Sequence, residues 1–551
     1  MTFAFAQPPL LAAAAADLTG IGSAVSEATV AAAAPTTGLL AAAADEISMG
    51  IAEVFGAYGQ EFQAIGAQLA AFHNQFVQSL TAAADAYINA EAINAAGLVQ
   101  GALGGLHTPT SPPALPPVFA QDTALVMGAT GLPIPTADYI NAVNNLFIQH
   151  IQPGAIPKAL VTPEQLYPNT GVKSLTFQAS VEQGLKILDS AIWEQITAGN
   201  HVTVFGYSQS AVIASLEMQH LISLGPNAPD PSQLSFILLG NEMNPNGGIF
   251  ARFPGLNIAS IGLPFYGATP DNPYPTTTYT IEYDGYADFP RYPLNLVSVF
   301  NALIGTYTLH PTYPLLTPEQ IASATPLPTQ GTTSNTYYMI RTEDLPLLAP
   351  VRALPVIGEP LAALVQPNLK VIVNLGYGDP YHGYSTSPAN VPTPFGLFPD
   401  VPPEVVVDAL AAGTQQGIQD FTAALPKALG SAPNIAPLEL SPDLLGVSPA
   451  LPPALPALPT PLEVANTFAA IVSTDYAVLL PAADLTLALL TTVPAYNATL
   501  FLSQLLQGNL VNAIGYPLAA TVTLVTLSGF IEFVVVTQAL VTNIGQLQAL
   551  T

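Results

Sequence analysis

The sequence predicts three parts: an N-terminal α-helical hairpin, a central α/β domain with a mainly parallel sheet, and an apolar helical C-terminal extension. Residues 1–100 are rich in alanine and repeat apolar side chains every three to four positions, which is typical of packed helices. Residues 121–400 alternate short apolar runs with helical segments, which favours parallel strands covered on both faces. Residues 462–551 have the composition of apolar helices.

The composition narrows the classes of function. The chain has 551 residues, enough for two or three domains, and 9 basic residues against 36 acidic ones give a net charge of −27. Such a chain is unsuited to nucleic acid, whose phosphates bind Lys and Arg. There is no cysteine, which excludes disulfides, thiolate metal sites and cysteine nucleophiles. Only 8% of residues are charged and 50% are hydrophobic, a balance that suits a lipid-rich surrounding.

The first 100 residues are expected to form a helical hairpin. A break at residues 35–38 (PTTG) separates one helix-forming run from a longer one. In the second run, apolar side chains between positions 47 and 80 recur at a spacing of about 3.5, the period of a coiled-coil seam. Two helices cannot enclose a core, so the seam predicts a helical partner; the alternative is packing on the rest of this chain.

Proline-rich segments and composition divide the remainder of the chain. We expect a linker at 101–120, the α/β domain at 121–400, a proline-rich region with a helix at 401–461, and an apolar helical tail at 462–551. In the tail, residues 516–540 approach the ~20 apolar positions of a membrane span but include Glu532. A buried helix is the favoured interpretation there, with membrane insertion as the alternative.

Short apolar runs locate the strands of the central domain. The predicted strands are residues 124–128, 202–205, 234–239 and 278–283, and the predicted helices are 181–198 and 211–224. Residues 369–375 (LKVIVNL) are also strand-like. The alternation of these strands with helices predicts a parallel sheet, and catalytic residues are expected at the carboxyl ends of its strands.

A candidate nucleophile lies between one of these strands and the next helix. Residues 206–210 (GYSQS) place Ser208 at the apex of a strand–turn–helix, with small residues two positions before and after it. This context is typical of the nucleophile elbow of an α/β-hydrolase. The following helix would direct its free amides at the serine oxygen and at a developing oxyanion. The competing interpretation is an ordinary turn whose serine caps the helix.

The base that such a serine needs is sought among seven histidines. Five are excluded by their place in the chain: His73, His107, His150, His201 and His220. His310 and His382 remain, and both follow Ser208, as the order Ser…Asp…His requires.

Three aspartates are candidates for the acid. Asp284 and Asp288 follow the strand predicted at 278–283, and Asp379 precedes His382 by three positions. We favour Asp288 with His310 over the pair of Asp379 with His382. Each aspartate could equally cap a turn, and at least two of the three are expected to do so.

Two backbone amides are needed to stabilise an oxyanion. Gln209, directly after the serine, would supply one, and the loop at 127–131 would supply the second, through Thr130 or Gly131. That loop is glycine-rich but lacks the third glycine of a dinucleotide-binding fingerprint.

Residues 1–100 resemble the PE module of mycobacterial PE/PPE proteins. The resemblance rests on residues 10–18 (LLAAAAADL), 34–38 (APTTG) and 72–77 (FHNQFV), whereas Pro8-Pro9 stands where the family has Pro-Glu. It implies a PPE-type helical partner and type VII secretion, with Tyr87 and Glu91 as the Tyr-x-x-x-Asp/Glu export motif. It also implies a secreted protein at the cell wall or outer envelope surface.

Residues 120–400 resemble the PE-PPE domain, a cutinase-like serine hydrolase. The matching segments are 205–211 (FGYSQSA), 283–290 (YDGYADFP), 309–313 (LHPTY) and 376–380 (GYGDP). In cutinase relatives the acid lies a few residues past its strand, which favours Asp288 over Asp284. The resemblance implies hydrolysis of short- to medium-chain acyl esters, or acyl transfer to a sugar or glycolipid acceptor.

The sequence therefore predicts an esterase or lipase that acts through Ser208, His310 and Asp288 on acyl ester lipids. The mechanism calls for no metal and no cofactor. Acyl transfer is the first alternative, and a non-catalytic envelope protein with a relic elbow is the second. The apolar composition also allows peripheral association with a membrane or envelope.

Overall fold

The computed structural model describes residues 8–38, scattered residues between 40 and 63, and residues 119–430 and 459–549. The chain divides into two compact units, Met1–Pro116 and Pro117–Thr551, which are described separately. In the first unit, helix α1 spans Pro8–Thr37, and its Thr29 carbonyl accepts a hydrogen bond from the Gln63 side chain at 3.0 Å. His73, His107, Tyr87 and Glu91 lie outside the described residues.

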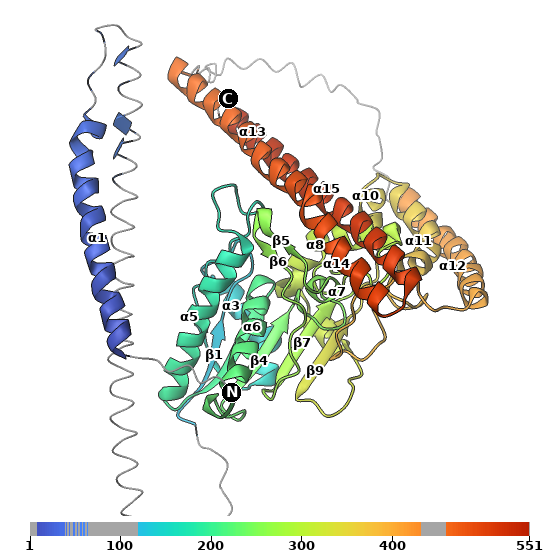
Figure 1. Cartoon of the computed structure of the whole chain (residues 1–551). Coiled ribbons are helices and arrows are strands. Elements are labelled where there is room, and N and C mark those ends of the chain that lie inside the picture. Colours follow the sequence, from blue (N-terminus) through green and yellow to red (C-terminus); the bar gives the residue numbers. More distant parts are fainter. Residues whose placement is uncertain are drawn as a thin grey trace, which may run out of the picture. The chain divides into compact units, whose positions relative to one another are not determined.

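The second unit contains a seven-stranded sheet in the order β2-β1-β3-β4-β7-β9-β8 (Figure 1). All neighbours pair in parallel except β8, which is antiparallel to β9. The strands are β1 (Asp122–Val126), β2 (Ile156–Ala159), β3 (His201–Tyr207), β4 (Leu234–Leu239), β7 (Thr276–Ile281), β8 (Thr325–Pro326) and β9 (Asn335–Ile340). A separate antiparallel pair joins β5 (Asn257–Ile258) to β6 (Leu263–Pro264). The predicted mainly parallel sheet is confirmed.

Helices cover both faces of this sheet. Those between the first strand and the last are α3 (Ala137–Val143), η1 (Asn144–Ile148), α4 (Gln149–Ile151), α5 (Phe177–Thr197), α6 (Gln209–Leu224), η2 (Gly225–Asn227), α7 (Ile249–Arg252), η3 (Ala259–Ile261), α8 (Leu296–Thr308), η4 (His310–Leu315) and α9 (Pro318–Ala322). Strand β3 sends Val202 and Val204 into the core on one face and Phe205 and Tyr207 into the core on the other. Both faces of the strand are thus apolar, which explains why it appears as a continuous apolar run in the sequence.

The segment at 369–375, expected to be a strand, is instead the end of a helix. After β9 come η5 (Pro346–Leu348), α10 (Ala349–Arg352), α11 (Gly358–Leu375) and α12 (Pro403–Gly430). Val371 and Val373 of α11 are buried, so the apolar run fills a helix face against the domain. β-Branched residues favour strands only weakly, and packing overrides that preference here.

The C-terminal extension consists of helices α13 (Pro461–Leu490), α14 (Thr492–Leu506) and α15 (Leu510–Gln548) (Figure 1). Asp484 fastens α13 to the sheet domain: its carboxylate accepts from the Tyr167 hydroxyl at 2.6 Å and its carbonyl from the Ser260 hydroxyl at 2.7 Å. By length and composition alone, the segments 461–506 and 510–548 could each cross a membrane. The stretch 516–540 lies in α15 and is only partly buried, with Ala519, Ala520 and Leu524 in the core.

Candidate active site

Ser208 occupies a sharp turn between the end of β3 and the start of α6. It adopts φ +58° and ψ −128°, a backbone conformation that a non-glycine residue rarely takes, and only 4% of its surface is exposed. A Cβ on Gly206 would lie 2.6 Å from the Ser210 carbonyl, so the turn requires glycine there. Ser210 ties the turn to the neighbouring loop, because its hydroxyl donates to the Gly128 carbonyl at 2.5 Å. This is the geometry of the predicted nucleophile elbow.

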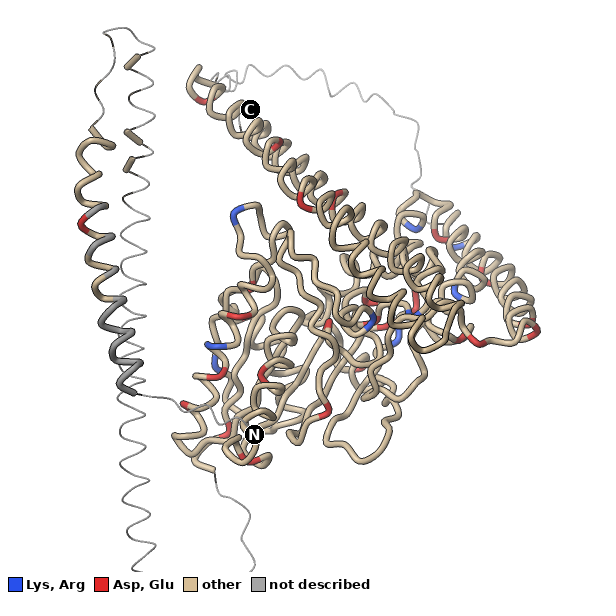
Figure 2. The backbone as a smooth tube through the Cα atoms, in the orientation of Figure 1, with Lys and Arg blue, Asp and Glu red and all other residues tan. Residues whose placement is uncertain are grey.

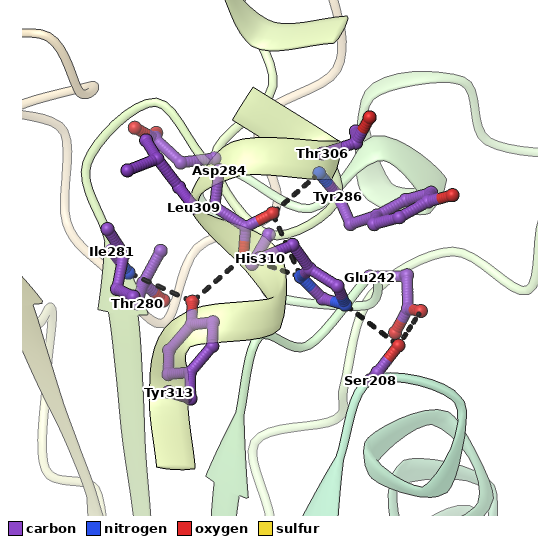
Figure 3. Close-up of polar contacts among 12 residues, drawn as sticks. Ser208, Glu242, Thr280, Ile281, Asp284, Tyr286, Thr306, Leu309, His310 and Tyr313 are labelled. Carbon is purple, nitrogen blue, oxygen red and sulfur yellow. Dashed lines mark hydrogen bonds and ion pairs between the residues drawn. The ribbon is translucent and has the colours of Figure 1, made fainter. Parts of the chain in front are cut away.

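His310 faces the serine from the first position of η4. Its Nε2 lies 2.8 Å from the Ser208 Oγ, within hydrogen-bond distance (Figure 3). The imidazole is buried between Tyr207 and Tyr286, whose ring centroids lie 5.5 and 4.7 Å from it. The Tyr207 hydroxyl also donates to the His310 carbonyl, which fixes the backbone that carries the ring. The predicted pairing of Ser208 with His310 is therefore present.

Asp284 is the carboxylate that contacts the other side of the imidazole. Its two oxygens lie 3.0 and 2.8 Å from His310 Nδ1 (Figure 3). The same carboxylate accepts from the Tyr313 hydroxyl at 2.8 Å and from the Tyr286 amide at 3.0 Å, and it is fully buried. A carboxylate held by several donors keeps one orientation, which in turn orients the histidine.

Asp288, the acid favoured from the sequence, does not contact His310, and that prediction is wrong in this structure. The chain after β7 turns tightly, so that the Asp288 amide donates to the Asp284 carbonyl at 2.6 Å. The Asp288 carboxylate folds back to accept from the Tyr283 amide at 2.9 Å. Burial raises its pKa well above the usual value, while the charge of the buried Arg252 opposes that rise. Asp288 therefore belongs to the core beneath the loop.

The alternative pair of Asp379 and His382 forms, but apart from the serine. His382 Nδ1 lies 3.1 Å from the Asp379 carboxylate, and both side chains are partly exposed. Asp379 also caps its own turn by accepting from the Tyr381 amide at 2.7 Å. The histidine that is hydrogen-bonded to the Ser208 hydroxyl is His310, not His382.

Three residues were predicted to supply the two oxyanion amides, and their backbone amides differ in whether they are already hydrogen-bonded. Within the described residues, the backbone amides of Gln209 and Thr130 make no hydrogen bond, so both could donate to a ligand. The Gln209 side chain donates to the Thr130 hydroxyl at 3.2 Å, which holds the loop against the helix start. Gly131 is a correction: its amide donates to the Glu164 carbonyl at 2.7 Å and is therefore occupied.

Glu242, which sequence reasoning missed, is a second carboxyl group beside the nucleophile. It follows β4, and its Oε1 accepts from the Ser208 hydroxyl at 3.3 Å (Figure 3). Burial raises the pKa of Glu242 to about 7, although the charge of His310 acts to lower it. Its position at the carboxyl end of a parallel strand was the one available signal.

The charges around His310 raise the pKa of its imidazole. Burial lowers the pKa of His310, but the charge and hydrogen bond of Asp284, together with the charge of Glu242, outweigh it. The net result is a pKa above the usual value for histidine. A raised pKa makes the imidazole a stronger base towards the serine proton.

A cavity of about 280 Å³ opens at Ser208 and His310. Its walls are mostly apolar side chains of the sheet domain, and one wall comes from α15 of the C-terminal extension. No sequence pattern had predicted that α15 would contribute to the cavity. Among the described residues, no group of three His, Asp or Glu side chains is placed to hold a metal ion.

Comparison with known proteins agrees with this architecture. The chain is 50% identical to Esterase PE16 of Mycobacterium tuberculosis over 76% of this chain and 75% of that protein. It is 48% identical to the uncharacterized PPE family protein PPE28 of that organism, over 88% and 79% of the two chains. The PE family protein PE3, also from that organism, is 45% identical over 76% and 88%.

Family models and solved structures complete the comparison. A solved cutinase-like protein from Cryptococcus sp. covers 32% of this chain and 82% of its own, with 17% identity and a TM-score of 0.22, too low to add to the assignment. The PE family model matches residues 4–94, and the PE-PPE domain model matches residues 153–378. The chain therefore belongs to the mycobacterial PE/PPE proteins, as a PE family member that carries a PE-PPE domain.

Proposed function

We propose that this protein is a serine esterase that hydrolyses acyl esters. The observation that carries the proposal is the continuous hydrogen-bonded chain from Ser208 through His310 to Asp284, set in an apolar cavity. A serine hydroxyl is a weak nucleophile until an adjacent base takes its proton, and the base needs a third group to orient it. The 50% identity to a protein named as an esterase supports the same reaction class.

The proposed mechanism uses these three side chains in sequence. Ser208 Oγ attacks the ester carbonyl carbon while its proton passes to His310 Nε2, 2.8 Å away. Asp284 balances the imidazolium that results. His310 then gives the proton to the leaving alcohol, and an acyl-enzyme remains on Ser208. Water, activated by the same imidazole, releases the carboxylic acid and regenerates the serine.

The oxyanion of each tetrahedral intermediate needs donors that are in place beforehand. The amides of Gln209 and Thr130 are assigned this role, because both are free among the described residues and lie beside the nucleophile. Gln209 is also the first residue of α6, whose N-terminus favours negative charge. The substrate is an ester with an apolar acyl group, because apolar side chains dominate the cavity walls.

The test is hydrolysis of p-nitrophenyl esters of several chain lengths by the full-length protein and three variants. We expect Ser208→Ala and His310→Ala to lower kcat by roughly 10⁴-fold or more. His382→Ala is the matched control and should keep wild-type activity, because His382 pairs with Asp379 elsewhere. Full activity in Ser208→Ala, or a well-folded wild type that hydrolyses none of the esters, would overturn the proposal.

A further inference from the structure

Helix α15 contributes one whole wall of the catalytic cavity. Its cavity-lining residues are Leu527, Phe530, Ile531, Val534 and Val535. These positions recur at steps of three and four, so they form a single stripe along the helix. The stripe belongs to the C-terminal extension, more than 200 residues beyond the triad along the chain. A site that otherwise lies at the edge of the sheet is thus completed by a distant segment.

Contacts with the sheet domain hold this wall in place. Phe530 packs edge-on against Tyr307 of α8, with ring centroids 5.6 Å apart. Tyr307 lines the same cavity, as does Tyr167, whose hydroxyl donates to Asp484 of α13 at 2.6 Å. The helices of the extension pack on one another as well, through Asn497 of α14 and Thr521 of α15 at 2.6 Å. The wall is therefore part of one packed unit with the triad.

The chemistry of the cavity indicates what it accepts. Of the described residues that line it, none is Lys or Arg, and Glu242, beside the serine, is the one carboxylic acid. The α15 stripe is entirely aliphatic or aromatic. The extension from 461 to 548 carries no basic residue and only four acidic ones, so little charge is seen along it (Figure 2). An uncharged hydrocarbon chain suits such a wall, because these side chains can bind a ligand only by burying its apolar surface.

We propose that α15 forms the acyl-chain site of the enzyme, with Phe530 and Val534 setting the length of acyl group that is accepted. The inference rests on the proposed esterase function, since the acyl chain must extend from an ester carbonyl at Ser208. Because the α15 side chains line the cavity, their volume affects the room left for methylene groups. Each methylene that is excluded or admitted changes selectivity by about tenfold or more.

Two matched pairs of variants in the full-length protein test this. Phe530→Ala widens the cavity and Val534→Phe fills it, whereas Phe533→Ala and Val536→Phe make the same changes at positions that are 64% and 47% exposed. The readout is the ratio of kcat/KM for the dodecanoyl ester to that for the butanoyl ester. We expect the ratio to rise about tenfold in Phe530→Ala and to fall about tenfold in Val534→Phe. The exposed controls should keep the wild-type ratio.

The possible outcomes separate this inference from the proposed function. An active wild type whose ratio is the same in all four variants would refute the acyl-chain site and leave the esterase intact. A wild type inactive on both esters would refute the esterase. In that case the acyl-chain site is tested by the binding of a fluorescent long-chain fatty acid to the Ser208→Ala protein. Weaker binding after Val534→Phe is added, with no change after Val536→Phe is added, supports the site. Equal binding in both refutes it. Near-ultraviolet circular dichroism establishes that each variant is folded.

Discussion

The carboxyl group of Glu242 and the hydroxyl of Ser208 are hydrogen-bonded at 3.3 Å, on the side of the serine that His310 leaves free. The nucleophile thus lies between an imidazole and a carboxyl group whose pKa burial raises to about 7. An ionised Glu242 competes with His310 for the serine proton. Its charge also stabilises the imidazolium, so the ionisation of Glu242 and that of His310 are coupled.

The first prediction concerns the pH dependence of Glu242→Gln. The raised pKa of His310 means that activity is lost when pH falls through that pKa, because the base becomes protonated. Removing the Glu242 charge removes one of the causes of the rise, so the acidic limb of the kcat/KM profile should move to lower pH. Profiles from pH 5 to 9 measure this. Glu217→Gln replaces a buried carboxyl group on α6 that interacts with Asp189 and acts on neither Glu242 nor His310, so it should leave the limb in place. A limb that moves upward in Glu242→Gln would contradict the coupling.

The second prediction separates the two aspartates of one loop. Asp284→Asn should lower kcat by roughly 10³- to 10⁴-fold, because a neutral amide neither holds the imidazole in the required orientation nor stabilises the positive charge of the imidazolium. Asp288→Asn should leave kcat within about threefold and act instead on thermal stability, since Asp288 neighbours the buried Arg252. Steady-state kinetics and melting curves on the two proteins provide the comparison. The reverse pattern would restore Asp288 as the acid.

The third prediction concerns stability and uses Glu217 on α6. This carboxyl group is fully shielded, and burial, with the charge of Asp189 adding to it, raises its pKa to about 8. Between about pH 4.5 and 8 the unfolded chain has lost the proton that the folded protein retains, so stability falls as pH rises through that window. Glu217→Gln should therefore gain roughly 1–3 kcal/mol at pH 8 and much less at pH 5. Chemical unfolding at both values tests it, with the exposed Glu194→Gln as a neutral control.

The elements that local sequence patterns determine were predicted well. The strand at 234–239 and the turn around Ser208 are confirmed, because a continuous apolar strand followed by small residues and an apolar helix has few alternative structures. His310 could be selected by chain order among the histidines, and it does contact the serine. These inferences needed no knowledge of the tertiary structure.

Other features depend on contacts that chain position does not reveal. Asp284 and Asp288 share one turn, and only the backbone path after β7 decides which carboxylate faces the imidazole. Glu242 approaches Ser208 because β3 and β4 are neighbours in the sheet. The α15 wall depends on packing between segments hundreds of residues apart, and its pattern resembles that of any buried or membrane helix. The prediction of a strand at 369–375 was wrong because β-branched residues also fill buried helix faces.

The last prediction follows from how closely the backbone approaches the histidine. Gly240, directly after β4, adopts φ +53°, and a Cβ there would lie 2.8 Å from His310 Cε1. Gly225 has nearly the same φ, +54°, but there is open space where its Cβ would lie. Alanine at either position should cost about 1–3 kcal/mol of backbone strain. Only Gly240→Ala should also displace the imidazole, because the added Cβ would overlap the His310 ring.

Measured at a temperature where both variants are folded, Gly240→Ala should lose about 10²-fold or more in kcat, since a shift of about 1 Å in a catalytic group has that effect. Gly225→Ala should retain wild-type kcat despite a similar loss in melting temperature. Because both variants carry a similar backbone strain, a difference in kcat between them reports the displacement of His310 alone. An equal kcat in both would mean that His310 can move aside without cost, and that Gly240 does not position the base against Ser208.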